Sequence, residues 1–150
     1  MVSMTASAIV KKDGSGWSFE FSDEAVWQIT FDYAVSIITE HVVLRIEREF
    51  EIAVEDRVIP IEPGSTRNAS EVVGLHQRAL MSASVQETGA LKVDFAGDMR
   101  LSVYPSEDPW EAFTLDVAGG WKFVSTPGGG LSWWLPGGAD GDVVEFRFTL

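Results

Sequence analysis

Cysteine is absent from this sequence. A chain without cysteine has no disulfide framework, no thiolate zinc site and no catalytic thiol, and it gives no indication of its redox compartment. Basic residues are scarce: the 150 residues include 11 Lys and Arg against 23 Asp and Glu, which gives a formal charge of −12 at pH 7. Proteins that bind the phosphate backbone need Lys and Arg to displace its counterions, so we do not expect nucleic acid as a partner.

Long apolar segments are missing as well. Residues Met1 to Val10 lack the apolar stretch of about 7–15 residues that a signal peptide requires. No window approaches the roughly 18 uncharged apolar residues that indicate a transmembrane helix. We therefore expect no secretion by a signal peptide, no membrane span and a cytoplasmic location.

Hydrophobic residues recur at every second position, which is typical of half-buried strands. Trp17, Phe19 and Phe21 follow the turn residues 13–16, and Leu91–Phe95 and Met99–Val103 flank a turn at 96–98, so each region predicts a hairpin. Val144, Phe146 and Phe148 predict a final strand. The fold class we expect is mainly β, as an antiparallel two-layer sandwich or flattened barrel in one domain over residues 1–150.

Two segments depart from this simple alternation. Pro63 and Gly64 end a strand, and Val72, Val73 and Leu75 form a partial helical stripe, so one short helix is expected over Asn68 to Leu75, capped by Asn68 or Ser70. Residues 47–62 mix carboxylates with apolar residues, which predicts an edge strand with a charged outer face.

The hydrophobic pattern also hints at an internal repeat. Val35–Ile37 and Leu44–Ile46 are similar to Leu91–Val93 and Leu101–Val103, at offsets of 56 and 57 residues. A pseudo-repeat would pair residues 17–62 with 76–116 and make the fold two similar meander halves. The pattern has two interpretations: a true internal duplication, or the likeness that any two hairpins share.

No arrangement of residues specifies a reaction. His41, at an expected turn, and His76, at the expected start of a strand, have no serine or carboxylate at an interpretable spacing, and no Gly-x-Ser-x-Gly motif is present. The carboxylate pairs Asp23–Glu24, Glu107–Asp108 and Asp140–Asp142 are expected to be solvated or to form turns. We therefore expect no enzyme, no catalytic residues, no metal site and no cofactor.

Tryptophan and acidic residues are the more informative features. Four of the six tryptophans lie between Trp110 and Trp134, and adjacent strand residues face opposite ways, so one of Trp133 and Trp134 is expected in the core and the other outside it. Exposed tryptophan is enriched in binding hot spots. The segment from Ser18 to Glu62 contains 11 acidic residues and only three arginines. This acidic excess either steers a basic partner or maintains solubility. The predicted partner-binding residues are Glu47, Glu49, Glu51, Glu55, Trp110 and Trp134.

One part of the chain resembles a group of known proteins. The segments 89–95, Tyr104–Pro105, 109–113 and 127–133 resemble small acidic bacterial proteins, frequent in actinobacteria, that are grouped as families of unknown function. Some similar chains are encoded beside polymorphic toxins and act as immunity proteins. The resemblance implies a β-rich intracellular bacterial protein and, by analogy, a binding role.

These features predict a non-catalytic protein-binding protein. The most concrete form is an immunity-type inhibitor that occludes a basic toxin domain with an acidic, tryptophan-bearing surface. The alternative is a carrier or sensor of a small ligand, with a cavity lined by Trp17, Trp121, Trp133 and Phe123, and a hydrolase ranks third. The sequence carries no indication of the partner's identity or of the oligomeric state.

Overall fold

The computed structural model describes residues 7–136 and 145–149, and it is 53% strand. Within the described residues the chain forms fourteen strands and one short helix. The mainly β fold class predicted from the alternating pattern is therefore confirmed. No helix in these residues is long and apolar enough to cross a membrane.

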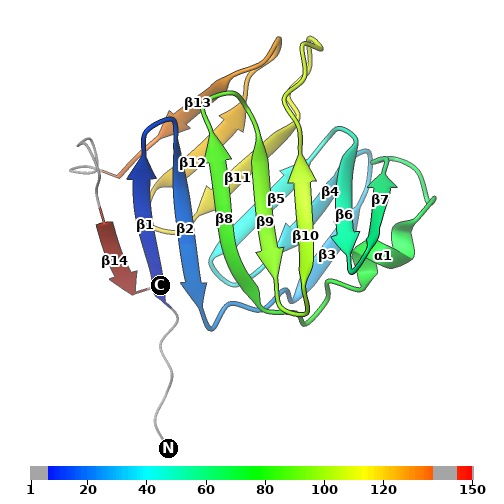
Figure 1. Cartoon of the computed structure of the whole chain (residues 1–150), viewed down its shortest axis with the longest axis horizontal. Coiled ribbons are helices and arrows are strands. Elements are labelled where there is room, and N and C mark those ends of the chain that lie inside the picture. The colour runs from blue at the N-terminus through cyan, green and yellow to red at the C-terminus, as the bar shows by residue number, and fades with distance from the viewer. Residues whose placement is uncertain (1–6, 137–144, 150) are drawn as a thin grey trace, which may run out of the picture.

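The strands form two antiparallel sheets that lie over one another (Figure 1). The eight-stranded sheet has the order β14 (Glu145–Thr149), β1 (Ser7–Asp13), β2 (Gly16–Ser22), β8 (Leu80–Gln86), β9 (Leu91–Phe95), β10 (Met99–Val103), β6 (Phe50–Val54) and β7 (Arg57–Ile61). The six-stranded sheet has the order β13 (Leu131–Trp134), β12 (Trp121–Ser125), β11 (Phe113–Val117), β5 (Val42–Ile46), β4 (Val35–Ile38) and β3 (Gln28–Phe31). Because each sheet keeps two free edges, the fold is a sandwich and not a closed barrel.

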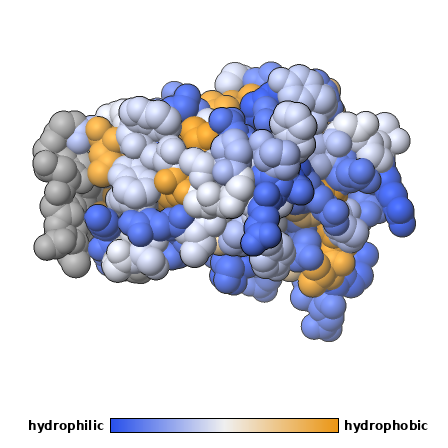
Figure 2. All heavy atoms as spheres, turned by 90° about the horizontal axis from the view of Figure 1, so that it is seen from above, coloured by the Kyte–Doolittle hydropathy of each residue, from blue (hydrophilic) through white to orange (hydrophobic). Residues whose placement is uncertain are grey.

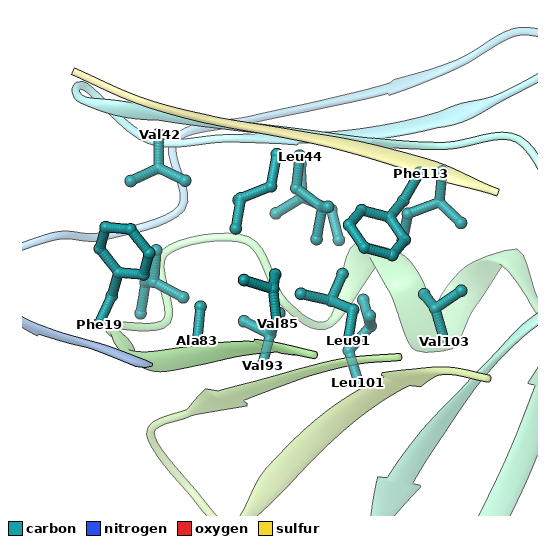
Figure 3. Close-up of a cluster of buried hydrophobic side chains, with 14 of the residues drawn as sticks. Phe19, Val42, Leu44, Ala83, Val85, Leu91, Val93, Leu101, Val103 and Phe113 are labelled. Atoms are coloured by element: carbon teal, nitrogen blue, oxygen red, sulfur yellow. The ribbon is translucent and has the colours of Figure 1, made fainter. Parts of the chain in front are cut away.

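The core consists of the inward residues of both sheets. Phe19, Val85 and Leu101 of the eight-stranded sheet point toward the side chains of Leu44 and Phe113 (Figure 3). These five side chains are all buried. The period of two in the sequence has its cause here, since only every second residue of a strand reaches the space between the sheets.

The two predicted hairpins are confirmed. In β1–β2, Asp13 pairs with Gly16, and in β9–β10, Phe95 pairs with Met99. A side chain at Gly16 is excluded, because a Cβ there would lie 2.3 Å from the backbone oxygen of Val85 in the neighbouring strand β8. The glycine thus permits β2 to pair with β8 directly beside the turn.

The C-terminal segment forms a strand, as predicted. β14 pairs with β1 along five residues, from Ser7 with Thr149 to Lys11 with Glu145. Val144, which the sequence placed in this strand, lies outside the described residues.

The segment 47–62 is not the single edge strand that its charge pattern suggested. It contains the hairpin β6–β7, in which Val54 pairs with Arg57 across the turn residues Glu55 and Asp56. β7 is the edge strand of the sheet, and β6 lies between β7 and β10. The prediction was wrong because the turn Glu55–Asp56 contains no glycine or proline to mark it, although Glu55 adopts a left-handed φ of 55°.

The predicted short helix is present as α1 (Ala69–Val73). Asn68 occupies the N-cap position but makes no capping hydrogen bond with its side chain. Its amide Nδ2 donates instead to the backbone oxygen of Pro60, at 2.9 Å, and so ties the helix to β7.

The two segments of the suggested repeat lie in different places. The hairpin β4–β5 belongs to the six-stranded sheet, whereas β9–β10 belongs to the eight-stranded sheet. Residues 17–62 and 76–116 each contribute strands to both sheets. A common origin of the two segments stays a prediction.

Candidate functional site

An open hollow of 480 Å³ lies at the end of the sandwich where β5 passes over to β6. Its lining combines carboxylates with exposed rings and is made of Tyr33, Glu47, Arg48, Glu49, Glu62, Pro63, Trp110 and Glu111. Figure 2 looks down on this end and shows hydrophilic residues gathered over its right half, on the side of β6 and β7. We call this feature the acidic hollow.

The crossover from β5 to β6 builds one wall of the acidic hollow. Ile46 ends β5 in one sheet and Phe50 begins β6 in the other, and both side chains are buried. The short segment between them is therefore held at the end of the sandwich. The backbone N–H of Glu47 donates to the oxygen of Ala112 at 2.8 Å, which fixes the direction in which the crossover leaves β5.

The connection between β10 and β11 builds the opposite wall. Asp108 in this connection forms an ion pair with Arg48 of the crossover, so the two walls are joined. The backbone N–H of Gly128 donates to the oxygen of Asp108 at 2.7 Å. Trp110 lies two residues further along the chain and is 72% exposed.

The charges of the acidic hollow are mostly negative. Glu47, Glu49, Glu62 and Glu111 line it, and the one cation among its lining residues, Arg48, is engaged by Asp108. Tyr33 is 71% exposed, and its ring lies 4.8 Å from the guanidinium carbon of Arg45. Carboxylates beside exposed aromatic rings suit a cationic surface, because the rings add a cation–π attraction to the charge attraction.

A smaller hollow adjoins the acidic hollow and shares Arg48 and Glu49 with it. Glu51 and Tyr104 line this smaller hollow. A hydrogen bond to the carboxylate of Glu51, together with the negative charge of that group, raises the pKa of Tyr104 above its ordinary value.

This geometry predicts the titration of Tyr104. The chain has two tyrosines, so Tyr33→Phe isolates the Tyr104 phenol. We expect it to ionise at higher pH than an ordinary tyrosine, whose pKa is about 10. Adding Glu51→Gln should move the midpoint down, because the anionic acceptor is lost. Tyrosinate absorbance measures both midpoints, and an unchanged midpoint after Glu51→Gln would contradict the contact.

The acidic hollow unites three of the predicted site residues and leaves two elsewhere. Glu47, Glu49 and Trp110 line it, and Glu51 lies in the adjoining hollow. Glu55 sits in the β6–β7 turn at the opposite end of β6 (Figure 1). Trp134 ends β13, at the far edge of the six-stranded sheet. The sequence analysis did not identify the remaining five lining residues: Tyr33, Arg48, Glu62, Pro63 and Glu111.

The expectation that one of Trp133 and Trp134 is buried was wrong. Their exposed fractions are 41% and 55%. The alternation itself holds, because Trp133 faces inward and its ring centroid lies 4.8 Å from that of buried Trp17. β13 is an edge strand, so Trp133 packs on the core with only part of its surface.

Substitutions of the two tryptophans should therefore differ only moderately in their effect on the free energy of unfolding. Trp133→Ala is expected to lower the free energy of unfolding by about 1–3 kcal/mol, because it loses the contact with Trp17. Trp134→Ala should change it by less than about 0.5 kcal/mol. Urea denaturation of both variants tests this, and equal losses would contradict the different orientations.

The sequence analysis also did not predict a contact between a histidine and a buried carboxylate. Nδ1 of His41 lies 2.5 Å from Oε1 of Glu24, and the side chain of Glu24 is 1% exposed. The interpretation of Glu24 as a solvated or turn-forming carboxylate was thus wrong. The two residues are 17 positions apart in different connections, and no local spacing indicates the contact.

The other histidine is also placed differently from the prediction. His76 lies in the turn between α1 and β8, and not at the start of a strand. Its Nε2 lies 3.1 Å from the backbone oxygen of Trp27. In the part of the chain that the structure describes, no three His, Cys, Asp or Glu residues are grouped to hold a metal ion. Asp140 and Asp142 lie outside that part.

Fold and surface together define this chain as an antiparallel β-sandwich protein with an acidic, aromatic-lined hollow at one end. The chain belongs to DUF6188, a family of unknown function, whose model matches residues 17–135. The matched region runs from β2 to the residue after β13 and includes the whole acidic hollow. No curated protein and no solved structure matches the chain.

Proposed function

We propose that this protein is a non-catalytic binding protein that recognises a basic protein partner through the acidic hollow. The observation that carries the proposal is the convergence of Glu47, Glu49, Glu62 and Glu111 with the exposed rings of Tyr33 and Trp110. In its most concrete form the protein is a cytoplasmic immunity-type inhibitor, which occludes the basic surface of a cognate bacterial toxin.

Two physical effects support this reading. A formal charge of −12 attracts a basic protein over several ångströms and raises the rate of association, an effect that salt weakens. Trp110 and Tyr33 supply large, rigid contact areas, and such rings are enriched among the residues that dominate binding energy. The charge of the acidic hollow thus speeds association with a basic partner, and its aromatic surface stabilises the complex.

The interior gives less support to the alternative of a small-ligand carrier. Trp17 lies against Phe123 and Trp133, with ring centroids 5.4 Å and 4.8 Å apart, so these rings fill the space that a ligand would need. The gap between the sheets beside Leu44 and Leu115 measures about 10 Å³. That is close to the volume a single water requires.

The proposal is tested with the protein encoded directly upstream of this chain. Coexpression should relieve growth arrest by that protein, and the purified pair should associate at a rate that falls steeply with salt. Combining Glu47→Gln, Glu49→Gln and Glu62→Gln should slow association about tenfold at low salt and flatten its salt dependence.

The matched control changes the same number of charges at the other end of the sandwich. Glu55→Gln, Asp56→Asn and Asp98→Asn lie in the β6–β7 and β9–β10 turns, away from the acidic hollow. This control should associate almost as fast as the unaltered chain. Equal slowing in both triple variants would assign the effect to overall charge, and absence of binding would overturn the proposal.

A further inference from the structure

A second hollow, of 530 Å³, lies at the opposite end of the sandwich from the acidic hollow. It is lined by Asp23, Glu24, Ala25, Trp27 and Glu40. These residues come from the crossover between β2 and β3 and from the turn between β4 and β5. Its size falls within the range of about 300–1,000 Å³ that is typical of small-molecule sites.

Backbone hydrogen bonds hold this crossover in place. The N–H of Val26 donates to the oxygen of Arg78, and the N–H of Leu80 donates to the oxygen of Glu24 at 2.7 Å. The N–H of Trp27 donates to the oxygen of Ile38 at 3.0 Å. The second hollow is therefore bounded by backbone that both sheets fix.

Glu24 is the residue that points to a ligand. Among the described residues that are buried, Glu24 is the only charged one. Its Oε1 lies within hydrogen-bond distance of Nδ1 of His41. Its Oε2 is also buried but has no hydrogen-bond partner. A buried carboxylate oxygen without a donor is costly, so a donor that enters through the second hollow would gain the bond that is missing.

The surroundings define the chemistry of that donor. Asp23 and Glu40 add two exposed carboxylates, and Trp27 presents an indole that is 62% exposed. No Lys or Arg lines the second hollow, and the nearby Arg78 donates its guanidinium to the backbone oxygens of Gly74 and Ala96. Because no group of three metal-ligating residues is present in the described chain, the donor set fits an organic cation better than a metal ion.

We infer that the second hollow binds a primary ammonium group, carried by a free alkylamine or by a lysine side chain. The ammonium donates to Oε2 of Glu24, and the exposed carboxylates of Asp23 and Glu40 attract its charge. The attached alkyl chain and the charge lie against the indole of Trp27, as in aromatic sites for ammonium ligands. This site is separate from the acidic hollow and does not depend on the function proposed for it.

Calorimetric titration of the full chain at low ionic strength tests this inference. The probes are cadaverine, as a free amine, and N-acetyl-lysine methylamide, as a lysine side chain. We expect saturable binding of one equivalent of at least one probe, and the tighter probe identifies the source of the ammonium. Glu24→Gln should weaken binding about tenfold or more, because it removes a charge-assisted hydrogen bond.

Two further variants make the test decisive. Trp27→Ala, at an exposed position, should weaken binding about fivefold and leave the fold intact. This variant therefore tests the inference even if Glu24→Gln does not fold. Glu55→Gln, at the same end of the molecule but outside the second hollow, should bind like the unaltered chain. Absence of saturable binding for both probes overturns the inference. Losses in Glu55→Gln equal to those in the other variants would also overturn it.

Discussion

Replacing His41 by alanine is expected to lower the free energy of unfolding by about 3–5 kcal/mol. The substitution removes the group that contacts Oε1 of Glu24 at 2.5 Å and leaves a carboxylate that is 1% exposed without any hydrogen-bond donor. A buried charge that loses its partner keeps its desolvation cost and loses the compensating attraction. Urea denaturation at neutral pH measures the loss as a lower midpoint at an unchanged slope.

Two comparisons separate the loss of the His41–Glu24 contact from other effects of removing a ring. His76→Ala removes an exposed histidine and should change stability by less than about 0.5 kcal/mol. His41→Ala in a Glu24→Gln background should cost less than in the unaltered chain, because no charge is then left buried. A loss below about 1 kcal/mol for His41→Ala alone would show that the carboxylate does not depend on His41.

The second large effect is expected at the centre of the aromatic cluster. Phe123→Ala should lower the free energy of unfolding by about 3–5 kcal/mol, because the ring is fully buried and the surrounding strands cannot close over the cavity. Its ring centroid lies 5.4 Å from that of Trp17 and 5.7 Å from that of Phe19, both on the opposite sheet. The substitution therefore removes contacts that hold the two sheets together.

The neighbouring residue on the same strand provides the control. Val124 lies on the outer face of β12 and is only partly buried, so Val124→Ala should cost less than about 1 kcal/mol. Both variants are measured by urea denaturation. Similar losses at the two positions would contradict the assignment of alternate residues of β12 to the core and to the outer face.

The parts of this fold that could be predicted from the sequence are local. The hairpins β1–β2 and β9–β10 follow from alternating residues on either side of short turns, and α1 follows a Pro-Gly break. Each of these patterns depends on neighbours within a few positions. The hairpin β6–β7 shows the limit, because the Glu55–Asp56 turn contains no glycine or proline to mark it.

Prediction of the candidate site was partial for a related reason. The acidic excess and the density of tryptophan drew attention to Glu47, Glu49 and Trp110, and the chain crossings place all three around one hollow. Tyr33, in the β3–β4 turn, and Glu111, in the β10–β11 connection, are far from each other in the sequence, and only the tertiary structure brings them to one hollow.

The sequence by itself determined the strand content, the main hairpins and the negative charge of this protein, because hydrophobic period, turn chemistry and net charge are properties of short segments or of composition. Only the tertiary structure decided which carboxylate is buried, which indole is covered and which acidic residues share a surface. Those outcomes depend on how the chain crosses between the two sheets. A crossing sets distances between residues such as Glu24 and His41, which no spacing along the chain encodes.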